Sequence, residues 1–212
     1  MPAIRPVQSR AAPRRRTQAE RSEITQRKVI QSALQLLEKV GFQRTNLQLI
    51  ARGAKLTLGA LQHQFSTRLA LWERVADEVM APLGDLGSVW PDNATALPLE
   101  KRARQFVRLA WEHVYGRPSY VAAWSMFFGS KTTPKLFKRI EQYRAKTDPL
   151  VNQHFLAMFP EIARQHPQAK HFTSMVFATL RGLALVRLFE VAESDMQAQL
   201  ESLVQIIVQA GR

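Results

Sequence analysis

Apolar residues recur at helical spacing along most of the chain, and short stretches containing glycine or proline separate the apolar stripes. The stripe from Ile30 to Val40 predicts a helix that begins near Glu20 and ends at Gly41, since glycine commonly ends helices. Further helical patterns lie near residues 99–115, 118–129, 134–158, 168–192 and 195–210. No segment alternates apolar and polar residues as a strand would, so the pattern predicts an all-α fold.

Two short helical patterns meet across a tight turn between Thr45 and Leu71. Thr45 is a suitable N-cap for the first helix, and Thr57 can cap the second. Leu61 and Phe65 are four residues apart and would point inward together. The stretch therefore has the pattern of a helix-turn-helix, although two short helices joined by a turn also occur in many all-helical proteins.

The outward face of the second short helix carries amide and imidazole groups. Glutamine can pair with adenine through two hydrogen bonds, and small apolar groups can contact a thymine methyl, so such a face suits base edges in the major groove. The candidate DNA-binding residues of the chain are Arg14, Arg15, Arg16, Thr45, Lys55, Thr57, Leu58, Ala60, Gln62, His63, Gln64 and Arg68.

The distribution of charge favours the DNA-binding interpretation. The formal net charge is +13, and residues 1–75 hold 14 Lys or Arg against 4 Asp or Glu, whereas residues 76–212 hold 16 against 13. Neutralisation of phosphates by Lys and Arg supplies most sequence-independent affinity for DNA. A membrane surface fits less well, because residues 1–28 lack large apolar residues opposite their basic ones. Residues 1–19 are expected to be a flexible basic arm that follows phosphates or a minor groove, with a solubilising tail as the alternative.

The run from Val29 to Leu71 resembles the DNA-binding domain of the tetracycline-repressor (TetR) family of bacterial transcription regulators. The positions that carry the resemblance are Val40-Gly41-Phe42, Thr45, Ile50-Ala51, Leu61, Phe65, Arg68 and Leu71. They cover about the first third of the chain. The resemblance implies a homodimer that binds a near-palindromic double-stranded DNA operator, with an all-helical second domain that binds a small-molecule effector.

Four positions depart from the family pattern. The family usually has Gly where Lys55 stands, Tyr where Gln62 stands, His where Gln64 stands, and Lys where Arg68 stands. The resemblance implies that Arg68 keeps a phosphate contact, whereas Gln62 and Gln64 would use amide hydrogen bonds.

The expected organisation has four parts. They are the arm at residues 1–19, a three-helix helix-turn-helix domain at 20–67, a connecting helix at 68–81, and a larger helical domain for effector binding and dimerisation at 82–212. The connecting helix is expected to end before Pro82, and the prolines and glycines of residues 82–98 predict a break.

Aromatic residues concentrate on two neighbouring helical patterns of the second domain, where they could line a ligand pocket or belong to the core. The candidate pocket residues are Arg108, Trp111, His113, Tyr115, Arg117, Tyr120, Trp124, Phe127 and Phe128. The patterns at 168–192 and 195–210 have apolar residues on nearly all sides, which predicts a dimer through a four-helix bundle, with burial inside a monomer as the alternative. The candidate dimer residues are Met175, Leu183, Val186, Leu200, Leu203 and Ile207.

The sequence argues against an enzyme. The five histidines show no i, i+4 pair, and there is no phosphate-cradling glycine loop or nucleophile elbow. No cofactor or metal is expected, and the absence of cysteine excludes disulfides and thiolate metal sites. No apolar run approaches the roughly 20 residues that span a bilayer, so a cytoplasmic location is expected. The prediction is a ligand-responsive, sequence-specific transcriptional repressor, with a non-specific nucleic-acid packaging protein as the alternative.

Overall fold

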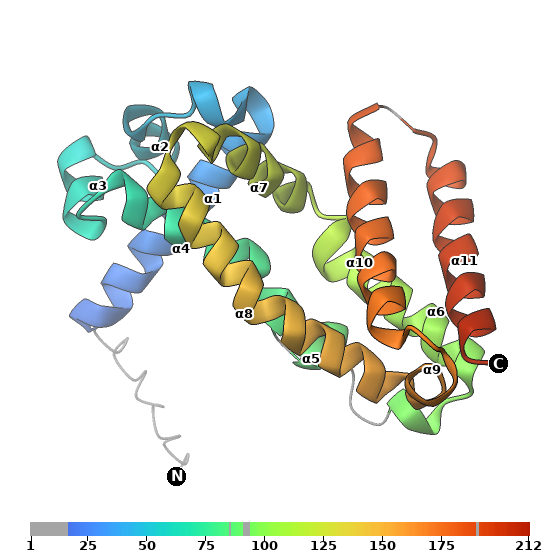
Figure 1. The fold of residues 1–212 in the computed structure, drawn as a ribbon. Helices are drawn as coiled ribbons and strands as arrows, with labels where there is room; N and C mark the ends of the chain where they lie inside the picture. Colours follow the sequence, from blue (N-terminus) through green and yellow to red (C-terminus); the bar gives the residue numbers. More distant parts are fainter. Residues whose placement is uncertain (1–16, 85, 91–93, 190) are drawn as a thin grey trace, which may run out of the picture.

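The computed structural model describes residues 17–84, 86–90, 94–189 and 191–212, and all regular structure within these ranges is helical, as predicted. The α-helices are α1 (Gln18–Arg44), α2 (Leu47–Gly53), α3 (Leu58–Gln64), α4 (Arg68–Gly84), α5 (Leu86–Val89), α6 (Leu99–Ala110), α7 (Pro118–Gly129), α8 (Pro134–Met158), α9 (Pro160–Gln165), α10 (Ala169–Val186) and α11 (Glu193–Ala210). Short helical turns follow α6 through Tyr115, α7 through Thr132 and α10 through Phe189. Helices α1–α3, which we call the head, lie at one end of the molecule, and α10 and α11 lie at the other (Figure 1).

Helix α1 begins at a capping box and bends at a glycine. The Thr17 hydroxyl accepts the Glu20 N–H at 3.2 Å, and the Thr17 N–H donates to Glu20 Oε2 at 2.8 Å. Gly41 has a φ of +73° and interrupts the helix, which continues for one more turn. Gly41 therefore ends the long part of the helix as predicted, because glycine adopts a positive φ without a steric penalty.

The head shares its hydrophobic core with the rest of the protein. Phe42 and Trp72 are buried there with their ring centroids 5.1 Å apart. The same core includes Ala122 and Met126 of α7 and Leu136 of α8. The head is thus packed against the helical domain and can respond to movements within it.

Helix α4 continues through Pro82, although we expected it to end there. Helix α8 likewise contains Pro149. The two helices pack along each other, and burial of their facing sides outweighs the hydrogen bond that each proline removes. Residues 82–98, which we expected only to break the helical pattern, also contribute to the core: Trp90 is buried, and its ring centroid lies 5.3 Å from that of Phe106.

Four phenylalanines form the centre of the helical domain. They are Phe106 of α6, Phe155 at the end of α8, Phe159, and Phe177 of α10. The contacting ring centroids are 4.7–5.9 Å apart, and most pairs are edge-to-face. This packing fixes the position of α10 relative to α6 and α8.

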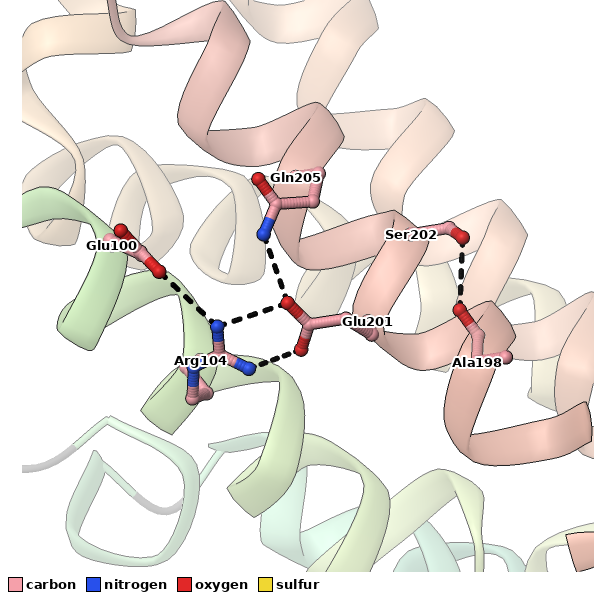
Figure 2. A network of polar contacts seen from close by, with 6 residues as sticks. All are labelled: Glu100, Arg104, Ala198, Glu201, Ser202 and Gln205. Carbon is pink, nitrogen blue, oxygen red and sulfur yellow. Dashed lines mark hydrogen bonds and ion pairs between the residues drawn. The ribbon is translucent and has the colours of Figure 1, made fainter. Parts of the chain in front are cut away.

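An ionic contact joins α6 to α11 on the surface (Figure 2). The Arg104 guanidinium contacts both carboxylate oxygens of Glu201 and also Glu100, and Gln205 donates to Glu201 at 2.9 Å. Hydrogen bonding from Gln205 and Arg104 lowers the pKa of Glu201. Ser202 lies on the other side of α11, away from Arg104 (Figure 2). That side of α11 is therefore free of α6.

Helix α10 is half core and half surface. Phe172, Val176, Phe177, Leu180, Leu183 and Ala184 are buried on its inner side. The outer side exposes Met175 (44%) and, in the turn that follows, Phe189 (78%). By length and composition alone, residues 169–189 could cross a membrane, contrary to our expectation from the sequence. In this fold the buried side packs against α8 and α11, and only the outer side lacks a cover.

Candidate nucleic-acid interface and ligand pocket

The turn between α2 and α3 is a Schellman motif. The Leu56 N–H donates to the Ala51 carbonyl at 2.9 Å, and the Lys55 N–H donates to the Arg52 carbonyl at 3.1 Å. Lys55 has a φ of +58° and is the only non-glycine residue with a positive φ among those described. A lysine therefore occupies the left-handed position that glycine occupies in the TetR pattern.

Helix α3 is short and held at both ends. The Thr57 hydroxyl accepts the Ala60 N–H at 3.1 Å and caps the helix, as predicted. Leu61 and Phe65 are 1% and 6% exposed, so both point inward as predicted. The exposed side presents Gln62 and His63, and Leu58 and Ala60 are half-buried beside them.

Gln64 differs from its exposed neighbours. It is half-buried, and the Ser22 hydroxyl of α1 donates to Gln64 Oε1 at 2.7 Å. The carbonyl of the amide is therefore engaged within the head, and only its NH₂ group remains for another partner. The contact also ties α1 to the end of α3.

One of the expected DNA-binding residues, Thr45, has a structural role. Thr45 is 1% exposed, and its hydroxyl donates to the Gly41 carbonyl at 2.7 Å. Asn46, not Thr45, caps α2 by accepting the Leu49 N–H at 3.0 Å. The prediction of Thr45 as the N-cap is therefore wrong, because Thr45 closes the end of α1 instead.

Arg68 is exposed but already has contacts within the head. Its guanidinium lies 3.4 Å from the Thr45 carbonyl and 5.8 Å from the centroid of the Phe42 ring. These contacts hold the start of α4 against the head. Arg14, Arg15 and Arg16 lie outside the described residues.

A pocket of about 220 Å³ lies between α4, α7, α8 and α10. Of the candidate pocket residues, Tyr115, Tyr120, Trp124 and Phe127 line it. The residues that sequence reasoning missed are Ala76, Val79, Ala123, Met126, Ile140, Arg144, Asp148, Val151, Asn152, Ser174, Phe177 and Arg181. One signal could have found Arg181, since it is the only charged residue between Lys170 and Arg187 except for the flanking His171.

The other predicted pocket residues lie elsewhere. Arg108 is exposed and pairs with Glu112 at 2.8 Å, one turn along the same helical stretch. Trp111, His113 and Arg117 do not line the pocket. Phe128 is 54% exposed and borders a separate surface hollow beside α1. The reason is geometric, because only one side of each helical stretch faces the cavity.

Two arginines and one aspartate are the charged residues that line the pocket. Arg144 pairs with Asp148 at 3.2 Å, one turn away on α8. Burial raises the pKa of Tyr115 well above its ordinary value and that of Tyr120 to about 12. A tyrosine hydroxyl is neutral at neutral pH in any case, and the raised pKa values keep both hydroxyls neutral at still higher pH. The charge of Arg181 opposes this rise at both hydroxyls, so its guanidinium lies within electrostatic reach of them.

Helix α7 carries contacts to both the pocket and the head. Trp124 and Phe127 line the pocket. Ser125 Oγ accepts the Phe42 N–H at 3.1 Å, and a Cβ at residue 129 would lie only 2.5 Å from Phe42 Cδ1. The absence of a side chain at Gly129 thus lets α7 approach the head closely.

The outer side of α10 and α11 exposes apolar residues. Met175, Phe189 and Ile206 are 44%, 78% and 42% exposed, and Ala178 and Gly182 lie exposed between the first two. Four of the expected dimer residues, Leu183, Leu200, Leu203 and Ile207, are instead in the core of the protomer. Met175 and the half-buried Val186 are the expected residues that remain accessible.

The chain is similar in sequence and in fold to known transcriptional regulators. The chain is 23% identical over 203 residues to the HTH-type transcriptional regulator CymR of Pseudomonas putida, and the match covers 92% of this chain and 95% of CymR. A transcriptional regulator from Rhodococcus sp. matches with a TM-score of 0.66 and 17% identity, over 87% of this chain and 96% of that one. The TetR-like regulator LfrR from Mycobacterium smegmatis, in complex with proflavine, matches with a TM-score of 0.60 and 13% identity, over 89% and 96%. No family model matches the chain. The protein has the fold of the TetR-family transcriptional regulators.

Proposed function

We propose that the protein is a TetR-family transcriptional regulator of the cytoplasm that binds a specific DNA sequence. The observation that carries this proposal is the exposed side of α3, which presents Gln62 and His63 from a helix fixed by a cap, a Schellman turn and the Ser22 contact. Both side chains can hydrogen-bond to base edges in a major groove. The relatives named above are transcriptional regulators, which supports the same assignment.

Selection of bound duplexes from a random pool tests this proposal. At a salt concentration that suppresses non-specific binding, a twofold dimer should enrich a near-palindrome with half-sites about one helical turn, or a multiple of it, apart. Binding that fades with salt and enriches no sequence would contradict the proposal. That result would instead favour a non-specific packaging protein.

Substitution of the exposed α3 residues then tests whether they contact the bases. Gln62→Ala or His63→Ala should weaken binding to the selected duplex by about 1–3 kcal/mol and relax the preference at one base pair of each half-site. Gln153→Ala, at an exposed glutamine of α8, is the matched control and should leave binding unchanged. Equal weakening on selected and random DNA would show that Gln62 and His63 contact the backbone instead.

We further propose that the protein acts as a homodimer through the outer sides of α10 and α11. Exposed Met175, Ala178, Gly182 and Phe189 form a stripe along α10 and its terminal turn. Half-buried Val186 lies between the last two, so successive residues of the stripe are three or four positions apart. Small residues in such a stripe allow two helices to approach closely, and a second copy would bury the same stripe symmetrically. Sedimentation equilibrium should therefore give the mass of two chains at micromolar concentration.

The pocket supports a response to a small molecule. Its walls come from α4 and α7, and both helices also contact the head through Trp72 and Ser125. A ligand that favours one arrangement of these helices would change the spacing of the two α3 helices in a dimer and hence the affinity for the operator. A ligand that binds the protein while leaving operator affinity unchanged would contradict this mechanism.

The pocket contains no arrangement of nucleophile and base that would suggest catalysis.

A further inference from the structure

We propose that the pocket binds an organic monocarboxylate with an apolar body about the size of a substituted benzene ring, and that Arg181 receives the carboxylate. This inference rests on the proposed ligand response, because it assigns a chemical class to the same site. It follows from the volume, the lining charges and the hydrogen-bond donors of the pocket.

The volume and the walls set the size of the apolar body. The cavity is about 220 Å³. A dry apolar cavity of about 150 Å³ holds benzene, so this one has room for a ring and a few further heavy atoms. Trp124, Phe127 and Phe177 contribute aromatic rings to the lining, and Val79 and Val151 add aliphatic groups.

The charged residues that line the pocket favour a negatively charged ligand. Arg144 is neutralised by its pair with Asp148, which is also the only carboxylate among the lining residues. Arg181 is half-buried, and no ion pair joins it to any carboxylate of the described residues. The pocket therefore carries one uncompensated positive charge. A partly buried guanidinium is stabilised by a carboxylate, which can accept two of its N–H groups at once.

The donors near Arg181 favour a carboxylate over a neutral ligand. Tyr115 and Tyr120 line the cavity, and a tyrosine hydroxyl can donate a hydrogen bond at neutral pH. Asn152 lines the same cavity and can also donate through its amide NH₂, whereas the Ser174 hydroxyl already donates to the Lys170 carbonyl at 3.1 Å. A carboxylate accepts several such hydrogen bonds, whereas a hydrocarbon would leave the donors without partners.

A cationic ligand is the alternative that these observations disfavour. The rings of Trp124 and Tyr120 could contact a cation, and LfrR, which has the same fold, was solved with proflavine. In this chain, however, a cation would meet two arginines and only one aspartate. The net charge of the pocket would repel it.

Isothermal titration of the purified full chain without DNA tests the proposal. The probes are 3-phenylpropionate, its neutral amide 3-phenylpropanamide, and proflavine. The carboxylate should bind at least about tenfold more tightly than the amide at pH 7, since hydrogen bonds to a charged group are the stronger ones. Equal affinity for the amide, tighter binding of proflavine, or no binding of the carboxylate would each overturn the proposal.

Substitution of Arg181 identifies the group that receives the carboxylate. Arg181→Gln should remove the preference for the carboxylate while leaving binding of the amide unchanged, and Arg181→Lys should retain part of the preference. Arg108→Gln is the control, because Arg108 is exposed outside the pocket. A preference that persists in Arg181→Gln would overturn the assignment of this residue, and amide binding shows that the variant is folded. DNA is absent from the titration, so the proposal of DNA binding stands or falls separately.

Discussion

Replacement of Lys55 by glycine should make the protein more stable and at the same time a weaker DNA binder. Lys55 occupies the left-handed position of the Schellman turn with a φ of +58°. It is exposed, so its side chain contributes little packing. A strained residue that persists at the entry to α3 suggests that its charge has a function there.

The expected gain in stability can be worked out from the backbone conformation. A non-glycine residue in the left-handed region costs about 1–2 kcal/mol, whereas glycine loses about 0.5–1 kcal/mol more backbone entropy on folding. The net stabilisation therefore lies between zero and about 1.5 kcal/mol, which corresponds to at most about 6 °C in Tm for a chain of this length. Differential scanning calorimetry at matched concentration measures this shift.

The expected loss in DNA binding follows from the charge. We expect the Lys55 ammonium to contact an operator phosphate, and each such contact contributes about 0.9 to the slope of log affinity against log salt. A dimer places two copies of the lysine on the operator, so Lys55→Gly should reduce the slope by about 1.8. Fluorescence anisotropy of a labelled operator across a salt series gives the slope.

Lys55→Asn separates the two effects. Asparagine tolerates the left-handed conformation and is uncharged, so it should lower the slope as glycine does. Its gain in Tm should be smaller, because it retains a side chain. A lower Tm for Lys55→Gly would refute the assignment of strain, and an unchanged slope in both variants would refute the phosphate contact.

Three further predictions concern other parts of the fold. Ser125→Ala removes the acceptor for the Phe42 N–H. It should reduce the effect of a bound ligand on operator affinity by up to about fivefold, as measured by fluorescence anisotropy. Ligand binding itself, measured by calorimetry, should not change. Glu161→Gln leaves the 2% exposed Arg102 guanidinium without its carboxylate and should destabilise the fold by about 3 kcal/mol in thermal melts at pH 7. Burial alone would raise the pKa of Glu161, but hydrogen bonds from its own backbone amide and from Arg102 lower it. The stabilisation from this ion pair is therefore present above the ordinary glutamate pKa and is lost as the pH falls through the lowered pKa. Acid should consequently destabilise Glu161→Gln less than the wild type. Ala178→Arg places a charge on the exposed stripe of α10 and should give a monomer in sedimentation equilibrium.

The sequence predicted the helices well because local signals mark their ends. Gly129 and Pro134 bound a turn between two helices, and Gly41 ends the long part of α1 where its φ becomes positive. The inward direction of Leu61 and Phe65 was also predictable, since they are one turn apart on a short helix with polar neighbours. These inferences need only residues that are close together in the chain.

The pocket and the outer side of α10 were harder to predict because they depend on which way each helix faces. A helix that is apolar nearly all round does not reveal its buried side, so Leu203 and Ile207 of α11 were assigned to a dimer surface although they are in the core. The pocket joins Ala76, Arg144 and Arg181, which lie on three helices far apart in the sequence. Only the tertiary packing shows that these side chains meet.

The packing of α7 and α4 explains how the pocket and the head can be coupled without a long chain of intermediates. Consecutive residues on a helix point about 100° apart, so Trp124 can face the pocket while Ser125 contacts the head. Gly129 brings α7 so close to Phe42 that a shift of the helix must move this residue as well. Helix α4 repeats the arrangement, with Ala76 in the pocket wall one turn beyond Trp72 in the head core. A ligand in the pocket would therefore touch two helices that are themselves part of the head packing, and a small change in their separation would reach α3 through α1, which packs against α4, α7 and α3.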